Sequence, residues 1–170
     1  MPTVYADASC RVLFDEGYLP VLISRWEGCI TESIARQTFA HMDGLLELAR
    51  QAGDRIIQVV DATASTRPDA LTRKVLAELT DAQLERFADA AFMPVFIAID
   101  SALVRGAVTA VNWISRKPVT TAPVASLGAA LGDAVERLTA EGIRPPSGLQ
   151  PSVYVFPEVD GPSVGSSDLG

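Results

Sequence analysis

The stretch Arg55-Ile56-Ile57-Gln58-Val59-Val60-Asp61 decides the fold of this chain. It is an almost continuous apolar run, a pattern typical of a strand that is covered on both faces, as in a parallel sheet. The stretch Pro94-Val95-Phe96-Ile97-Ala98-Ile99-Asp100 has the same character. Helical patterns follow both runs, and strands that alternate with helices predict an α/β domain whose sheet is mainly parallel, with right-handed crossovers.

Upstream of this core, residues 11–14 and 21–25 are short β-rich runs separated by turn residues. They predict an N-terminal antiparallel hairpin on the edge of the sheet. The expected register places Cys10 opposite a position near Arg25 and well short of Cys29. We therefore expect both thiols to be free, as in a reducing compartment.

Helical spacing and capping residues predict the remaining elements. One helix begins after Thr31 and ends at Gly53, and another covers 101–114. The region after Thr66 predicts either two helices or one kinked helix, because Thr80-Asp81-Ala82-Gln83 is a second candidate capping box. A strand near 119–124 and a helix over 126–142 complete the expected fold.

The C-terminal segment differs in composition from the rest of the chain. Residues 145–170 are rich in Pro, Gly and Ser, contain acidic residues and lack Lys and Arg. Such a segment buries too little surface to offset the entropy of ordering, which predicts a domain over 1–144 and a disordered tail over 145–170. Within this tail, Val153-Tyr154-Val155-Phe156 is an island apolar enough to dock on another surface.

Composition excludes several classes of function. The 170 residues carry a net charge of −7, which argues against non-specific binding to nucleic acid or anionic lipid. No signal peptide or membrane-length apolar stretch is recognisable, so we expect a cytoplasmic protein without a membrane partner. With His41 as the single histidine and two cysteines, neither a nucleophilic triad nor a zinc site is expected. The sequence also lacks nucleotide-binding and hydrolase motifs, so we expect no catalytic residue, no metal and no cofactor.

Asp61 and Asp100 end two predicted neighbouring strands. In open parallel sheets ligands bind beyond the carboxyl ends of the strands, where two carboxylates can hold Mg²⁺ or transfer protons. The alternative is that each aspartate only caps a turn or the following helix.

The loop 62–67 is the second candidate site. Its hydroxyl groups lie before a helix N-terminus, with arginines on this loop and on the next helix, a combination that can bind an anion or a protein partner. Simple capping with solvated arginines is the alternative. The candidate residues are Thr63, Ser65, Thr66, Arg67 and Arg105.

Over residues 10–141 the chain resembles the STAS-like superfamily, the fold of anti-anti-sigma factors and of sulfate-transporter tails. The resemblance rests on the order of elements, on the step Gly28-x-Ile30-Thr31, on the Ser/Thr loop after Asp61 and on the helix over 103–114. In anti-anti-sigma factors the corresponding loop is an Asp-Ser-Ser-Gly-like turn with a phosphorylated serine. Here, in the stretch 64–69, the acidic residue before the candidate Ser65 or Thr66 and the glycine after it are missing.

The resemblance implies a non-enzymatic regulatory domain that binds another protein, and a homodimer. The hairpin strands would also leave an edge that needs cover. The alternative is a binding protein for a small apolar or anionic ligand, held between the strand ends and the helix over 101–114. A preformed apolar cavity beneath that helix would favour the ligand, and a flat exposed apolar patch without a cavity would favour the protein partner.

Overall fold

A computed structural model describes residues 2–87, 92–115 and 121–159 of the chain. In these residues six strands form one sheet in the order β1-β2-β3-β4-β5-β6. The strands are β1 (Thr3–Ala6), β2 (Cys10–Asp15), β3 (Val21–Gly28), β4 (Ile56–Asp61), β5 (Phe92–Ala98) and β6 (Thr121–Val124). The first three strands pair antiparallel, whereas β3 to β6 pair parallel. The predicted α/β fold with an N-terminal antiparallel hairpin is therefore confirmed.

The structure adds one strand that the sequence analysis did not predict. β1 pairs with β2 from Thr3↔Phe14 to Ala6↔Arg11, so it forms the edge of the sheet and places the predicted hairpin strands in its interior. The strand is short, and both of its faces are partly buried, so no alternation of apolar and polar residues marks it.

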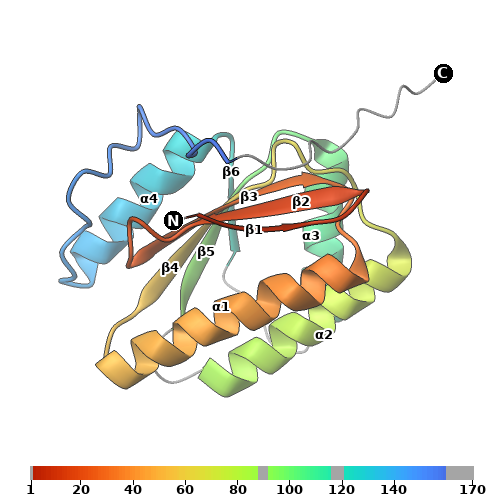
Figure 1. The fold of residues 1–170 in the computed structure, drawn as a ribbon, viewed down its shortest axis with the longest axis horizontal. Helices are drawn as coiled ribbons and strands as arrows, with labels where there is room; N and C mark the ends of the chain where they lie inside the picture. The colour runs from red at the N-terminus through yellow and green to blue at the C-terminus, as the bar shows by residue number, and fades with distance from the viewer. Residues whose placement is uncertain (1, 88–91, 116–120, 160–170) are drawn as a thin grey trace.

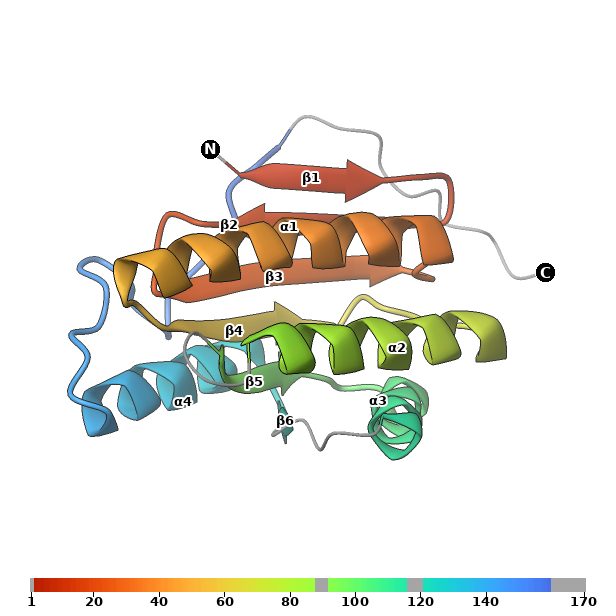
Figure 2. The ribbon, with the colours of Figure 1, turned by 90° about the horizontal axis from the view of Figure 1, so that it is seen from below.

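The helices lie on two sides of the sheet. α1 (Glu32–Ala52), α2 (Ala70–Phe87) and α3 (Ala102–Ile114) cover one face, and α4 (Leu127–Ala140) covers the other (Figures 1 and 2). The physical reason is the strand order. Since β3 to β6 are neighbours in sequence order, three right-handed crossovers in one direction place three helices on the same face.

α2 is a single helix, which settles the alternative left open by the sequence. Thr80 does not cap a second helix: its hydroxyl donates to the carbonyl of Leu76 within the helix, at 2.8 Å. The N-terminal cap of α2 is Asp69, whose carboxylate accepts from the Thr72 amide at 2.7 Å. Thr66, after which the sequence predicts the helical region to begin, lies outside the helix.

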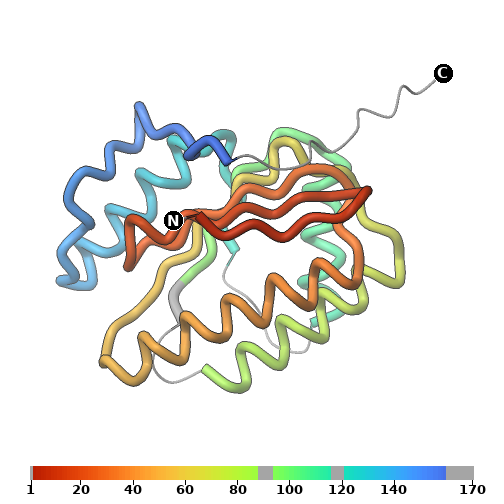
Figure 3. The backbone as a smooth tube through the Cα atoms, in the orientation of Figure 1, coloured from red at the N-terminus to blue at the C-terminus, as the bar shows by residue number. Residues whose placement is uncertain are grey.

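The face covered by α4 also holds the described part of the predicted tail, residues 145–159, which runs beside the helix (Figure 3). Phe156 is 6% exposed and belongs to the same apolar cluster as the inward side chains of α4. The Tyr154 hydroxyl donates to Asp15 at 2.8 Å, and Arg11 donates to the carbonyl of Val159 at 3.0 Å. Packing thus continues past the expected boundary at 144, because the apolar island supplies aromatic rings that this face buries. Residues 160–170 lie outside the described residues, as do 116–120 at the start of the predicted last strand.

The hairpin register differs from the expectation. Cys10 pairs with Gly28 rather than with a position near Arg25, so the backbone brings Cys10 and Cys29 to neighbouring positions. Both cysteines are free thiols. The difference arises at the turn, where Asp15 pairs with Ile23 and Phe14 with Ser24, so that every later pair is shifted along the second strand.

Candidate functional site

A cavity of about 180 Å³ lies between the sheet and the three helices α1, α2 and α3. Strands β2 to β6 form its floor, and the three helices form its roof. The side chains around it are mostly apolar. They include Val12, Trp26, Phe39, Met42, Val60, Leu76, Val95, Ile97, Val104, Ala107, Val108 and Val111. An apolar cavity beneath the helix over 101–114, the feature that would favour the ligand alternative, is therefore present.

The cavity lies where the backbone of α3 is set back from the strands, although Val104 and Val108 of α3 still pack with Val60 and Ile97. α3 packs mainly on α2, whereas α4, on the other face, packs directly on β4 and β5. Val60 and Ile97 lie on central strands, yet both remain only half-buried. Side chains in the middle of a sheet under a closely packed helix would be fully buried, so the roof over this part of the sheet is loose.

Two buried glutamines bring polar groups to the cavity wall. Gln83 on α2 donates to Asp43 on α1 at 2.7 Å. The side-chain nitrogen of Gln58 on β4 is buried and has no hydrogen-bond partner among the described residues. Of the described side chains around the cavity, Glu27 is the one that carries a charge. An uncharged ligand suits such a wall better than an anion, because the wall offers no cation.

The predicted loop 62–67 forms one rim of the cavity. Ser65 bridges Gly28 in a parallel arrangement, and its hydroxyl donates to the carbonyl of Trp26 at 2.7 Å. The Thr66 amide donates to the Gly28 carbonyl at 2.8 Å, while the Gly28 amide donates to Ala64 at 3.0 Å. The loop thus extends the pairing of β3 with β4, and Ser65 and Thr66 line the cavity.

Gly28 is the residue that this junction requires. Its φ is +74°, and a Cβ atom there would lie 2.3 Å from the carbonyl oxygen of Ser9. Only glycine adopts this backbone conformation at low cost while admitting so close an approach.

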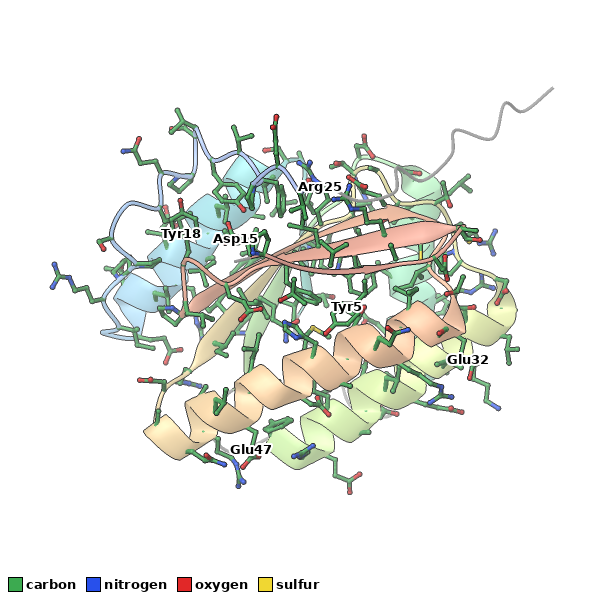
Figure 4. All side chains as sticks on the ribbon, in the orientation of Figure 1. Tyr5, Asp15, Tyr18, Arg25, Glu32 and Glu47 are labelled. Carbon is green, nitrogen blue, oxygen red and sulfur yellow. The ribbon has the colours of Figure 1, made fainter. Side chains whose placement is uncertain are left out.

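Asp61 and Thr63 belong to a different group. Asp61 is buried, accepts from the Thr63 hydroxyl at 2.7 Å, and forms an ion pair with Arg25 at 3.2 Å. Arg25 also lies over the ring of Phe156 at 4.2 Å. Side chains alternate along a strand, and Ile57 and Val59 pack on the α4 face, so Asp61 lies on that face as well. Figure 4 shows Arg25 on this side with Asp15 and Tyr18, whereas Tyr5 lies between the sheet and α1.

The remaining candidates lie outside both groups. Asp100 is exposed after β5, and Arg105 on α3 donates to the carbonyl of Ile99 at 3.2 Å. Arg67 is exposed, and its carbonyl oxygen lies 3.7 Å from the Cys29 sulfur. No contact joins Asp61 with Asp100 in the described structure. Among the seven predicted residues, Asp61 and Thr63 therefore form one group, and Ser65 and Thr66 form another at the cavity.

Two groups near the cavity have altered proton affinities. Burial raises the pKa of the Cys10 thiol, which lines the cavity and so stays protonated near neutral pH. Hydrogen bonds from the Thr72 amide and side chain lower the pKa of Asp69. A charged Asp69 at the N-terminus of α2 meets the helix dipole favourably and leaves less attraction there for an anionic ligand.

Sequence reasoning missed Gln58, Trp26 and Gln83. Gln58 is the single polar side chain inside a run of apolar ones, and that interruption was the available signal. Trp26 and Gln83 carry no comparable signal, because their contribution depends on how α1, α2 and the sheet meet.

Comparisons with known proteins add a likeness of fold. Neither a scan against protein-family models nor a search of curated proteins finds a match. Among solved structures, the chain is similar to the crystal structure of an anti-sigma factor antagonist from Mycobacterium paratuberculosis, with 15% identity and a TM-score of 0.45. The match covers 75% of this chain and 96% of that one.

The described part of the chain has two further properties. There, no helix combines the length and the apolar character needed to cross a membrane. Within the same residues, no group of three His, Cys, Asp or Glu side chains is placed to hold a metal ion.

Proposed function

We propose that this domain binds a small, uncharged and mainly apolar molecule in the cavity between the sheet and α1–α3. The observation that carries the proposal is the cavity itself, with its apolar wall and a volume of about 180 Å³. An apolar cavity of roughly 150 Å³ is large enough to bind benzene. The ligand we infer is therefore compact, of the size of one substituted ring.

The proposal departs from the anionic alternative because of charge. Glu27 is the charged side chain at the wall, and among the described lining residues there is no arginine or lysine. Burying an anion without a cationic partner is strongly unfavourable. No catalytic role is included in the proposal, since neither of the aspartates that suggested one lines the cavity.

Filling the cavity tests this function. Ala107 on α3 is buried and lines the cavity, so Ala107→Leu places new methyl groups in the space that the ligand would occupy. We expect the parent to bind small ring compounds with saturable change in the fluorescence of Trp26, and Ala107→Leu to bind them at least tenfold more weakly. Trp113→Phe in both proteins removes the second tryptophan signal.

The matched control is Ala110→Leu, which adds the same side chain to the same helix. Ala110 does not line the cavity. Equal binding by the parent and Ala107→Leu, with Ala110→Leu also unchanged, would show that the cavity is not the binding site.

A second candidate function, recognition of another protein, is favoured by the outer surface of α3. Leu103 is 66% exposed, Trp113 is 85% exposed and Ile114 is 49% exposed. Leu103 and Ile114 are about three helical turns apart and lie on the same side of α3, and Trp113 lies about 100° from Ile114 around the helix axis. Large apolar side chains gathered on a surface are typical of interaction sites.

The homodimer expected from the family resemblance is the simplest partner to test on this surface, because the hairpin strands that were expected to leave an uncovered edge are interior to the sheet. Light scattering at micromolar concentration should give a dimer mass for the parent and a monomer mass for Leu103→Ser with Trp113→Ser. The control is Leu48→Ser, an exposed leucine on α1. A monomer mass for the parent would contradict the homodimer, and this surface would then bind a different protein or none.

A further inference from the structure

Gln58 stands in the middle of the sheet with its side chain on the cavity face. Its backbone pairs with Leu22 on β3 and with Val95 on β5, so the position is fixed from both sides. The side chain is 6% exposed and contributes to the cavity wall together with Val60 on the same strand. Strand alternation keeps residues 58 and 60 on one face.

The terminal amide of Gln58 has an unmet hydrogen-bonding capacity. Its nitrogen is buried and lacks a partner among the described residues. Buried polar groups in folded proteins are nearly always paired, and an unpaired one calls for an explanation. A core leucine would fill the same place in the sheet without this penalty.

Four further polar side chains around the cavity are engaged with the protein. Gln83 donates to Asp43, the Ser65 hydroxyl to Trp26 and the Thr80 hydroxyl to Leu76. Asn112 donates to the Thr121 hydroxyl at 2.9 Å. A ligand inside the cavity therefore meets an apolar surface and a buried donor, the Gln58 side-chain nitrogen, that has no hydrogen-bond partner among the described residues.

We infer that Gln58 selects, among small apolar molecules, those that present one hydrogen-bond-accepting oxygen, such as a cyclic ketone. The apolar wall binds the hydrocarbon frame, and the oxygen accepts from the Gln58 amide. This inference rests on the proposed function and names its ligand class. A site built to pair with a polar group discriminates against an analogue that lacks it, because the site's own group is then left unpaired.

The test uses two probes that differ in one atom group. Cyclohexanone carries the acceptor oxygen, and methylenecyclohexane replaces that oxygen by a CH₂ group of similar shape. Titrations followed by Trp26 fluorescence, in full-length protein with Trp113→Phe, give a dissociation constant for each probe. We expect the parent to bind the ketone about tenfold more tightly than the alkene, the ratio that one buried hydrogen bond supplies.

Gln58→Leu should abolish the preference and still bind the alkene at least as tightly as the parent does. Gln58→Met provides the same comparison with a flexible side chain if the leucine variant does not fold, as judged by circular dichroism. Gln83→Leu is the matched control, because it removes the other buried glutamine of the wall and should keep the preference for the ketone.

The outcomes separate the two proposals. If the parent binds neither probe, the proposed function fails and the inference fails with it. Equal binding of both probes by the parent would support the cavity as a binding site and overturn the role of Gln58. A preference that survives in the leucine or methionine variant would also overturn that role.

Discussion

The two faces of the sheet differ in how closely the helices pack on them. On one face α4 lies directly on β4 and β5, and its inward residues Ala130, Leu131, Ala134 and Leu138 are completely buried. On the other face α1, α2 and α3 enclose a cavity over the same strands. Small residues let α4 approach the strands, whereas α3 packs on α2. The comparison teaches that one sheet can provide a rigid support on one side and a binding space on the other.

Removing the cover of the closed face should have the largest effect. Truncation after Arg144 deletes Tyr154 and Phe156, which pack on β2 and β3, and we expect a loss of about 4 kcal/mol in the free energy of unfolding. The melting temperature should fall by roughly 8–16 °C. Calorimetry measures both.

The control for this truncation ends the chain after Val159 and keeps the described contacts. We expect it to melt within about 2 °C of the parent, because it keeps the contacts of Tyr154, Phe156 and Val159 with the closed face. Equal melting of the two truncated proteins would mean that the aromatic residues add nothing to the closed face.

The same substitution on the two faces should give opposite results. Ala134→Leu forces a larger side chain between α4 and the strands and should lower the free energy of unfolding by about 1–3 kcal/mol. Ala107→Leu extends into the cavity and should lower it by no more than about 0.5 kcal/mol, because the space is already there. Urea unfolding of both variants measures the difference, and similar losses would contradict the contrast in packing.

A smaller effect, of opposite sign, is expected at Gln58. Gln58→Leu removes a buried amide without a partner among the described residues and should raise the free energy of unfolding by about 1 kcal/mol. The gain corresponds to a melting temperature higher by roughly 2–4 °C. Gln83→Leu, which breaks the bond to Asp43, should lower stability instead. If Gln58→Leu lowers the free energy of unfolding, the Gln58 amide has a hydrogen-bond partner in the folded protein.

The smallest effect concerns the cap that holds α2 over the open face. The Thr72 amide lowers the pKa of Asp69 in the folded protein, so the carboxylate contributes stability above its ordinary pKa of 3.8. This contribution is lost as the pH falls through the lowered folded pKa. Asp69→Asn caps the helix without titrating. The stability difference between parent and variant should therefore shrink between about pH 7 and about pH 2.5, and urea unfolding at both values measures it. If the stability difference between the parent and Asp69→Asn does not depend on pH, the lowered pKa of Asp69 does not contribute to the stability of the fold.

The sequence predicted the layout of the parallel part of the sheet because burial on two faces leaves a direct mark. The runs at 55–61 and 94–100 are apolar throughout, and the strands β4 and β5 follow them. The edge strand β1 has no such mark. Thr80 illustrates a second limit: a capping residue and a helix residue that bonds back to its own turn have the same local sequence.

The site was less accessible to sequence reasoning than the fold. The hydroxyl groups of the loop 62–67 indicate a binding site, and two of the residues that carry them, Ser65 and Thr66, do line the cavity. Asp61, chosen with them, lies on the opposite face with Arg25, because alternation along β4 separates it from residues 58 and 60. The packing of the aromatic residues 154 and 156 depends on contacts with strands more than 100 residues earlier, which local composition does not report.

The junction at Gly28 has a consequence for how this domain tolerates change. Three chain segments meet there: the end of β3 at Gly28, the segment at Ser9, and the loop 62–67. The Ser9 carbonyl lies against Gly28, and the loop is joined to Gly28 through Ala64 and the amide of Thr66. In a library of all substitutions at this position, we expect selection for a folded product to return glycine alone, since alanine already introduces both the clash and the strained backbone. Directed evolution of new ligand preferences can therefore vary cavity residues of α1, α2 and α3, but has to keep glycine at position 28.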